Sequence, residues 1–197
     1  MRDFCYRLHN DPDSIPAHHR YSIGGPLEQL ADHPAVVGFM DEFVSDSYAG
    51  EHCYGFRLES TFSTIRGKGD GNYQPHGGRG MFNFPGNSHT YHMHHDRAHS
   101  GLTRVVWELN PVQRGDGGTL FLTGSHKGAY PPPASTADRN SDLWEDYECS
   151  AGSALIFTEA ITHTGNRWNN DRVDRVAIFN CYNVVGNKWH KWDPYPQ

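Results

Sequence analysis

The sequence lacks the features that place a protein in a membrane or carry it across one. No stretch approaches the roughly 20 consecutive apolar residues that a membrane-spanning helix needs. The first residues, Met1-Arg2-Asp3-Phe4, do not lead into the apolar run of a signal peptide. We therefore expect a cytoplasmic protein with no membrane partner, folded as a single domain over residues 1–197.

Cysteine is scarce, and basic residues are not gathered into a patch. The four cysteines (Cys5, Cys53, Cys149 and Cys181) are widely separated and form no CxxC pair, so a zinc-binding or redox-active cysteine site is not expected. Free, packed thiols are the better interpretation. The net charge is -6, and lysine and arginine are scattered, which argues against a nucleic-acid partner.

Glycine (21), proline (12) and aromatic residues (5 Trp, 10 Tyr and 10 Phe) are abundant instead. Short apolar runs separated by Gly, Asn, Asp and Pro predict strands, in a sandwich or jelly roll rather than a parallel α/β sheet. The expected strands lie at 53–63 and near 90–94, 102–109, 119–123, 153–158 and 176–183. Residues 1–25 are polar and turn-rich and are expected to wrap over the surface, and residues 66–88 predict a lid or binding loop.

One helix is expected between this polar start and the first strand. Apolar residues recur at helical spacing from Val36 to Val44, Asp32 is placed to cap the helix, and Pro34 suits its first turn.

The main chemical signal is His94-His95-Asp96, with His163 far downstream and Arg175 after it. In a strand, His94 and Asp96 share one face, and His163 follows an apolar run that predicts another strand. Two histidines and one carboxylate form the facial triad that holds a non-haem Fe(II). Arg175 is placed to grip a dicarboxylate beside that metal, because a planar guanidinium can donate two parallel hydrogen bonds.

Each of these residues has an ordinary structural interpretation when taken alone. A local competitor is His92-x-His94, which follows Gly86 as in a cupin motif. The expected glutamate is missing, however, because Ala98 and His99 occupy its positions. Four nearby histidines are expected to surround the site, contact substrate or face solvent: His89, His92, His95 and His99.

The chain resembles the phytanoyl-CoA dioxygenase family of Fe(II)- and 2-oxoglutarate-dependent oxygenases over roughly residues 85–185. The matching motifs include His-His-Asp at 94–96, the strand Leu-Thr-Arg-Val-Val-Trp-Glu-Leu at 102–109, and Gly-Gly-Thr-Leu-Phe-Leu-Thr-Gly-Ser-His-Lys at 117–127. The remaining ones are Ala-Leu-Ile-Phe at 154–157, His-Thr-Gly-Asn at 163–166, and the strand Arg-Val-Ala-Ile-Phe-Asn-Cys-Tyr at 175–182.

The resemblance implies a mainly β, cupin-like double-stranded β-helix (jelly roll) with a few flanking helices. It implies an enzyme in which His94, Asp96 and His163 bind Fe(II), and Arg175 binds 2-oxoglutarate. With O2, it would hydroxylate a small organic molecule and release succinate and CO2. Relative to the family, the N-terminal part is expected to be shortened. The segment after His163 lacks the serine often found near the cosubstrate, and Arg172 is a second candidate anchor.

Further site residues are expected on the core strands. Thr119 is a candidate contact to the cosubstrate, and Arg57, Glu59 and Trp107 are candidate substrate contacts. Two other functions stay open: a cupin-type metal enzyme that does not use 2-oxoglutarate, and a non-catalytic jelly-roll binding module. The first would depend on His92, and the second would form no succinate.

Overall fold

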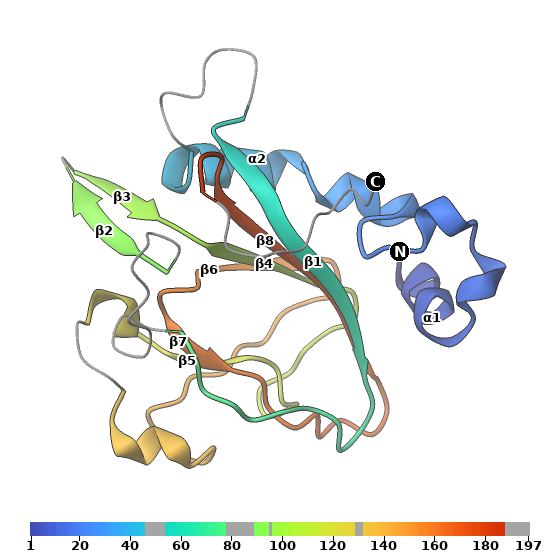
Figure 1. Ribbon diagram of the computed structural model, residues 1–197. Coiled ribbons are helices and arrows are strands. Elements are labelled where there is room, and N and C mark those ends of the chain that lie inside the picture. Colours follow the sequence, from blue (N-terminus) through green and yellow to red (C-terminus); the bar gives the residue numbers. More distant parts are fainter. Residues whose placement is uncertain (46–53, 78–88, 95, 129–131, 188–197) are drawn as a thin grey trace.

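A computed structural model of the chain describes residues 1–45, 54–77, 89–94, 96–128 and 132–187, without the side chain of His94. Its centre is a four-stranded antiparallel sheet with two smaller sheets beside it and helices on one face (Figure 1). The prediction of a mainly β, cupin-like jelly roll with a few flanking helices is confirmed.

The large sheet contains the longest strands of the protein. In spatial order they are β1 (Phe56–Arg66), β8 (Arg175–Val184), β4 (Thr103–Glu108) and β6 (Ser153–Thr158). All neighbours are antiparallel, and a register shift between Leu58 and Ser60 leaves Glu59 as a bulged residue of β1. Because β1 and β8 pair over their whole lengths, Arg66 and Arg175 lie directly opposite each other.

Two short sheets face or flank this one. The first pairs β5 (Leu120–Leu122) with β7 (Thr162–Thr164), and the second is the hairpin of β2 (Tyr91–His94) and β3 (Arg97–Ser100). Phe121 of β5 meets Phe157 of β6 edge to face at 4.9 Å, so the β5–β7 sheet packs across the inner face of the large sheet. Strands β3 and β7 were not expected from the sequence.

Helices cover the opposite, outer face of the large sheet (Figure 1). The α-helices are α1 (Arg2–Asn10) and α2 (Pro34–Phe43), and the 3-10 helices of the N-terminal part are η1 (Pro12–Ser14), η2 (Ala17–His19) and η3 (Gly25–Leu30). Two further 3-10 helices, η4 (Ser125–Lys127) and η5 (Ala134–Ala137), lie on the side of the β5–β7 sheet (Figure 1). The expected helix is α2, although its N-cap is His33, whose Nδ1 accepts from the Ala35 amide, and not Asp32. Helix α1 was not expected within the turn-rich residues 1–25, and it buries Cys5 against the sheet.

Strand alternation gives the large sheet two different faces. On β4, Val105 and Trp107 point outward into the core under the helices, while Arg104, Val106 and Glu108 point inward. The inner face therefore carries charge at its two ends and apolar side chains between them.

Cys5, Cys149 and Cys181 are free thiols, as expected, and Cys53 lies outside the described residues. Within the described ranges, no helix has the length and apolar character needed to cross a bilayer.

Candidate metal and cosubstrate site

A cavity of about 130 Å³ lies between the inner face of the large sheet and the β5–β7 sheet. Its lining residues come from both layers and from the loop after β1: Phe62, Arg66, His76, Arg104, Thr119, Phe157, His163, Gly165, Arg175 and Phe179. Most small-molecule pockets measure roughly 300–1,000 Å³, so this space suits a ligand smaller than a typical drug.

His163 is held in the form that binds metals. The side chain is 5% exposed, and its Nδ1 lies 2.9 Å from the Ile161 carbonyl oxygen. Because a carbonyl can only accept, Nδ1 must carry the proton and Nε2 is left with a lone pair. Burial lowers the pKa of His163 to about 4, against the opposing effect of Glu159, so the ring is neutral at physiological pH. A neutral imidazole fixed through a backbone carbonyl is a typical metal ligand.

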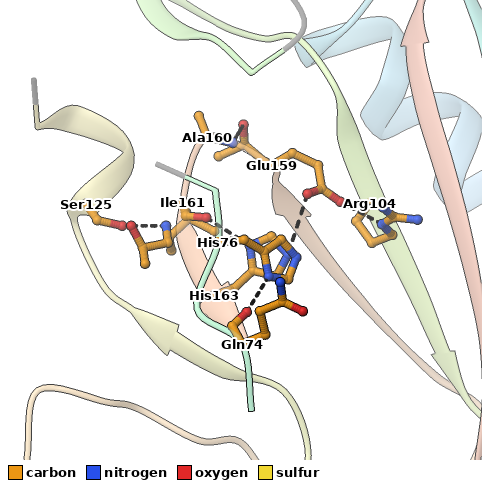
Figure 2. Close-up of polar contacts among 10 residues, drawn as sticks. Gln74, His76, Arg104, Ser125, Glu159, Ala160, Ile161 and His163 are labelled. Atoms are coloured by element: carbon orange, nitrogen blue, oxygen red, sulfur yellow. Dashed lines mark hydrogen bonds and ion pairs between the residues drawn. The ribbon is translucent and has the colours of Figure 1, made fainter. Parts of the chain in front are cut away.

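Glu159 and His76 lie beside this imidazole (Figure 2). Glu159 Oε2 is 3.5 Å from His163 Nε2, and the rings of His76 and His163 have centroids 4.2 Å apart. His76 Nδ1 lies 2.7 Å from the Gln74 carbonyl oxygen, which leaves its Nε2 free as well. One ligand atom from each of the three residues lies within 4.8 Å of the others, so these described residues could themselves hold a metal.

The backbone brings His76 to His163 through a short antiparallel bridge. The His76 amide donates to the His163 carbonyl at 3.0 Å, and the reverse hydrogen bond measures 2.8 Å. Gly77 makes this approach possible, since its φ is +79° and a Cβ there would lie 2.3 Å from the Ile161 carbonyl oxygen. The sequence contained no motif that could have marked His76 as part of the site.

A buried ion pair fixes the carboxylate of Glu159. Arg104 on β4 contacts Glu159 Oε1 through Nε at 2.7 Å and through Nη2 at 2.6 Å. Although burial alone would raise the pKa of Glu159, the Arg104 guanidinium, together with His163, lowers it to about 2. The carboxylate is thus ionised, with one oxygen on the arginine and the other facing His163 (Figure 2).

Arg175 lies at the other end of the cavity and is 1% exposed. Its Nε and Nη2 donate to Glu108, with Nη2 2.5 Å from Oε1. Nη2 also contacts the Thr119 hydroxyl at 3.2 Å and the Tyr147 hydroxyl at 2.9 Å. Thr119 and Arg175 therefore meet in the cavity as the sequence suggested, whereas Arg172 lies in an exposed surface hollow near α1.

The proposed ligands His94 and Asp96 lie on the β2–β3 hairpin. β2 ends at His94, and Asp96 is an exposed turn residue with φ 63°, so the expectation that both lie in one strand was wrong. Aspartate tolerates this left-handed conformation better than most residues, which suits a two-residue hairpin turn. The side chain of His94 and all of His95 lie outside the described residues, so the assignment of His94 and Asp96 to the metal stays a prediction.

Two sets of contacts anchor this hairpin to the rest of the protein. Arg97 donates to the Asp41 carbonyl at 2.7 Å and to the Glu42 carbonyl at 3.0 Å, near the end of α2. On the other side, Tyr91 meets the ring of His126 in η4 at 4.7 Å, edge to face. These contacts fix the two ends of the hairpin to different layers of the protein.

Comparison with known proteins decides the family. The family model described as phytanoyl-CoA dioxygenase (PhyH) matches residues 19–177 of the chain. The chain belongs to the phytanoyl-CoA dioxygenase family. The predicted family is confirmed, and it is a family of oxygenases that use iron and 2-oxoglutarate, which agrees with the predicted enzyme class and cofactors.

The curated relatives align with only part of this chain. The protein Rv1501 of Mycobacterium tuberculosis is 30% identical over 91 residues, which are 45% of this chain and 32% of the relative. This chain thus spans about a third of the length of that curated relative.

Solved structures share the fold over most of the chain. HygX from Streptomyces hygroscopicus, solved with nickel and 2-oxoglutarate, has a TM-score of 0.73 at 19% sequence identity. The alignment covers 94% of this chain and 78% of the HygX chain. EctD from S. alaskensis has a TM-score of 0.64 at 15% identity, covering 96% of this chain and 69% of its own.

The candidate substrate contacts lie outside the cavity of this PhyH-family protein. Trp107 packs in the core on the helix-covered face and meets His33 edge to face at 5.2 Å, and its substrate role stays a prediction. Arg57 and Glu59 form an ion pair, and Arg57 lines a separate outer groove of about 720 Å³. A substrate role for Arg57 and Glu59 stays a prediction.

Proposed function

We propose that this protein is a dioxygenase that hydroxylates a small organic molecule. When bound, Fe(II) and 2-oxoglutarate would activate O2 for that hydroxylation, with release of succinate and CO2. The observation that carries the proposal is one cavity with the free Nε2 of His163 at one end and the buried guanidinium of Arg175 at the other. Such a cavity suits a metal and a dicarboxylate bound side by side.

The residues of the chain would divide the work between them. His163 would hold the metal through Nε2, its tautomer fixed by the Ile161 carbonyl. Arg175 and Thr119 would bind the distal carboxylate of 2-oxoglutarate. Apolar rings between the two ends, Phe157 and Phe179, would exclude water and strengthen the polar contacts inside.

For the other two metal ligands we propose His94 and Asp96. The segment that enters the β2–β3 hairpin lies near the cavity, because His89 is close enough to Glu159 to affect its pKa. Burial raises that pKa, Arg104 and His163 lower it, and His89 lowers it to a smaller extent. Binding of one metal by all three residues would require the turn of the β2–β3 hairpin to lie beside His163. The Glu159 carboxylate is already compensated by Arg104, which makes it a poorer ligand than the exposed carboxylate of Asp96.

A second ligand set, His76, Glu159 and His163, has a specific observation in its favour. Glu159 Oε2 and His163 Nε2 are both acceptors and face each other at 3.5 Å, an arrangement that a cation between them would stabilise. This set would leave the function unchanged and alter only the residues that hold the metal.

One spectroscopic experiment separates the two ligand sets. Anaerobic addition of Fe(II) and 2-oxoglutarate should give the weak visible charge-transfer band of a chelated complex. We expect His94→Ala, Asp96→Ala and His163→Ala to abolish the band, and His76→Ala to retain it. Loss of the band in His76→Ala and Glu159→Gln, with retention in His94→Ala and Asp96→Ala, would instead establish the second set.

The activity itself is tested by succinate release across a panel of small molecules. HygX has been solved with hygromycin B bound and EctD with 5-hydroxyectoine, so the panel should include aminoglycosides and small zwitterions. Succinate formed only with 2-oxoglutarate present would support the proposal. Turnover without 2-oxoglutarate that is lost in His92→Ala would indicate a cupin-type enzyme, and absence of succinate across the panel would favour a binding module.

A further inference from the structure

The charges of the cavity do not balance. Three arginines line it, and two of them have buried carboxylate partners: Arg104 pairs with Glu159 and Arg175 pairs with Glu108. Arg66, the last residue of β1, forms no ion pair with any carboxylate in the described part of the chain. The cavity therefore has one positive charge in excess, and a partly buried cation without a counter-charge favours an anionic ligand.

The position of Arg66 makes that excess costly. Arg66 and Arg175 are directly opposed cross-strand partners on β1 and β8, and like charges in such positions destabilise a sheet. Burial and the nearby charge of Arg175 lower the pKa of Arg66. An anion between the two guanidinium groups would relieve this repulsion.

Both arginines also have an unused donor. Nη1 of Arg66 and Nη1 of Arg175 are buried and have no hydrogen-bond partner among the described residues. The Nε and Nη2 edge of Arg175 is already occupied by Glu108, so Arg175 cannot bind a carboxylate through that edge. It offers a single free nitrogen, and its charge is compensated by Glu108. A bound carboxylate needs a second donor and a counter-charge from another residue.

We infer that Arg66 supplies both, as the second anchor for the distal carboxylate of 2-oxoglutarate. This inference rests on the proposed function, because it assigns a further binding residue for the same cosubstrate. The distal carboxylate would lie between Nη1 of Arg175 and Nη1 of Arg66, with the Thr119 hydroxyl beside them.

Gly165 accounts for the room that Arg66 occupies. A Cβ at residue 165 would lie 3.2 Å from Arg66 Nη1 and 2.8 Å from the Asn72 carbonyl oxygen. Any larger side chain at residue 165 would press on the guanidinium of Arg66.

The test compares the binding of two ligands to the unsubstituted protein and to variants of Arg66. Calorimetric titration of anaerobic Fe(II)-loaded protein measures the Kd of 2-oxoglutarate and of 2-oxobutanoate, which lacks the distal carboxylate. We expect Arg66→Gln to weaken 2-oxoglutarate binding by on the order of 10- to 100-fold, as for the loss of a charge-assisted hydrogen bond. Binding of 2-oxobutanoate and of Fe(II) should change less than about twofold. Arg66→Lys keeps the charge but not the planar fork, so its Kd for 2-oxoglutarate should lie between those of the unsubstituted protein and Arg66→Gln.

Arg172→Gln, an exposed arginine outside the cavity, is the matched control and should leave all three affinities unchanged. Equal weakening of both ligands in Arg66→Gln, or unchanged 2-oxoglutarate binding, would overturn the inference; if Arg66→Gln does not fold, the same comparison applies to Arg66→Lys. Failure of the unsubstituted protein to bind 2-oxoglutarate would refute the proposed function as well, so the two failures are distinguishable.

Discussion

Replacing Glu108 by glutamine tests how the cavity tolerates its arginines. The Glu108 carboxylate is fully buried and accepts hydrogen bonds from Arg175 at 2.5 Å and from the Tyr147 hydroxyl at 2.5 Å. Glutamine keeps the shape and one oxygen acceptor but removes the charge. Arg175 is then a buried cation without a partner, directly opposite Arg66. Breaking a buried ion pair on one side typically costs about 3–5 kcal/mol.

Urea unfolding at pH 7 measures this cost. We expect Glu108→Gln to lower the free energy of unfolding by about 3–5 kcal/mol, a large fraction of the roughly 5–15 kcal/mol typical of a native protein. The matched control is Glu28→Gln, because Glu28 is 63% exposed and lies 3.7 Å from His19, and such surface pairs contribute at most about 1 kcal/mol. The double variant Glu108→Gln/Arg175→Gln should lose less than the sum of the single losses, because it removes both charges.

A second measurement links this stability to the ligand. Added 2-oxoglutarate should stabilise Glu108→Gln more than the unsubstituted protein, because the anion would compensate two cations instead of one. A loss no larger than that of Glu28→Gln, or equal stabilisation of both proteins by 2-oxoglutarate, would refute the charge balance described for the cavity.

Three further predictions concern the frame around the site. Gly77→Ala should lower the free energy of unfolding by about 1–3 kcal/mol, because of its positive φ and the contact with the Ile161 carbonyl, and urea unfolding against Gly38→Ala, a position with free space, checks it. Arg97→Ala should weaken Fe(II) binding several-fold in a metal titration, because the hairpin loses its two hydrogen bonds to the end of α2; unchanged affinity would argue against a ligand role for the hairpin. Burial raises the pKa of Cys5 to about 11 and of Cys181 to about 12, so the protonated thiols stabilise the fold fully below the unfolded pKa near 9. That contribution is lost as the pH rises through the folded pKa values, so the free energy of unfolding should fall above pH 9. It should fall less steeply with pH in Cys181→Ala, and an equal slope in the two proteins would contradict the raised pKa of Cys181.

The long elements of the fold were predictable from the sequence, and the short or polar ones were not. β6 has the predicted bounds, and β8 begins one residue before the predicted start, because each contains an unbroken run of four apolar residues. α1 was missed because its buried face is narrow and most of its residues are polar. β3 reads Arg-Ala-His-Ser and β7 has three residues, so neither shows a pattern that distinguishes a strand from a loop.

The candidate site was predictable only where a motif or a strand boundary marked it. His163, Arg175 and Thr119 meet in the cavity, and each was expected from its place in the sequence. His76 and Arg66 were not found, because a loop residue and the end of a strand reach the cavity through tertiary packing. Strand alternation shows which face Trp107 occupies: Trp107 and Arg104 are an odd number of residues apart on β4, so they point to opposite faces.

The same alternation explains why one sheet can carry both a core and a polar site. On β4, the inward residues Arg104 and Glu108 are two alternations apart, so they lie at different ends of the inner face, where Arg104 pairs with Glu159 and Glu108 pairs with Arg175. One pair leaves a carboxylate oxygen facing His163, and the other leaves Nη1 of Arg175 without a hydrogen-bond partner among the described residues. A metal at the first end and a carboxylate at the second would complete the two networks with opposite charges. The spacing of two charged residues on a single strand thus sets the polarity of the cavity, and with it the orientation in which a 2-oxo dicarboxylate would bind.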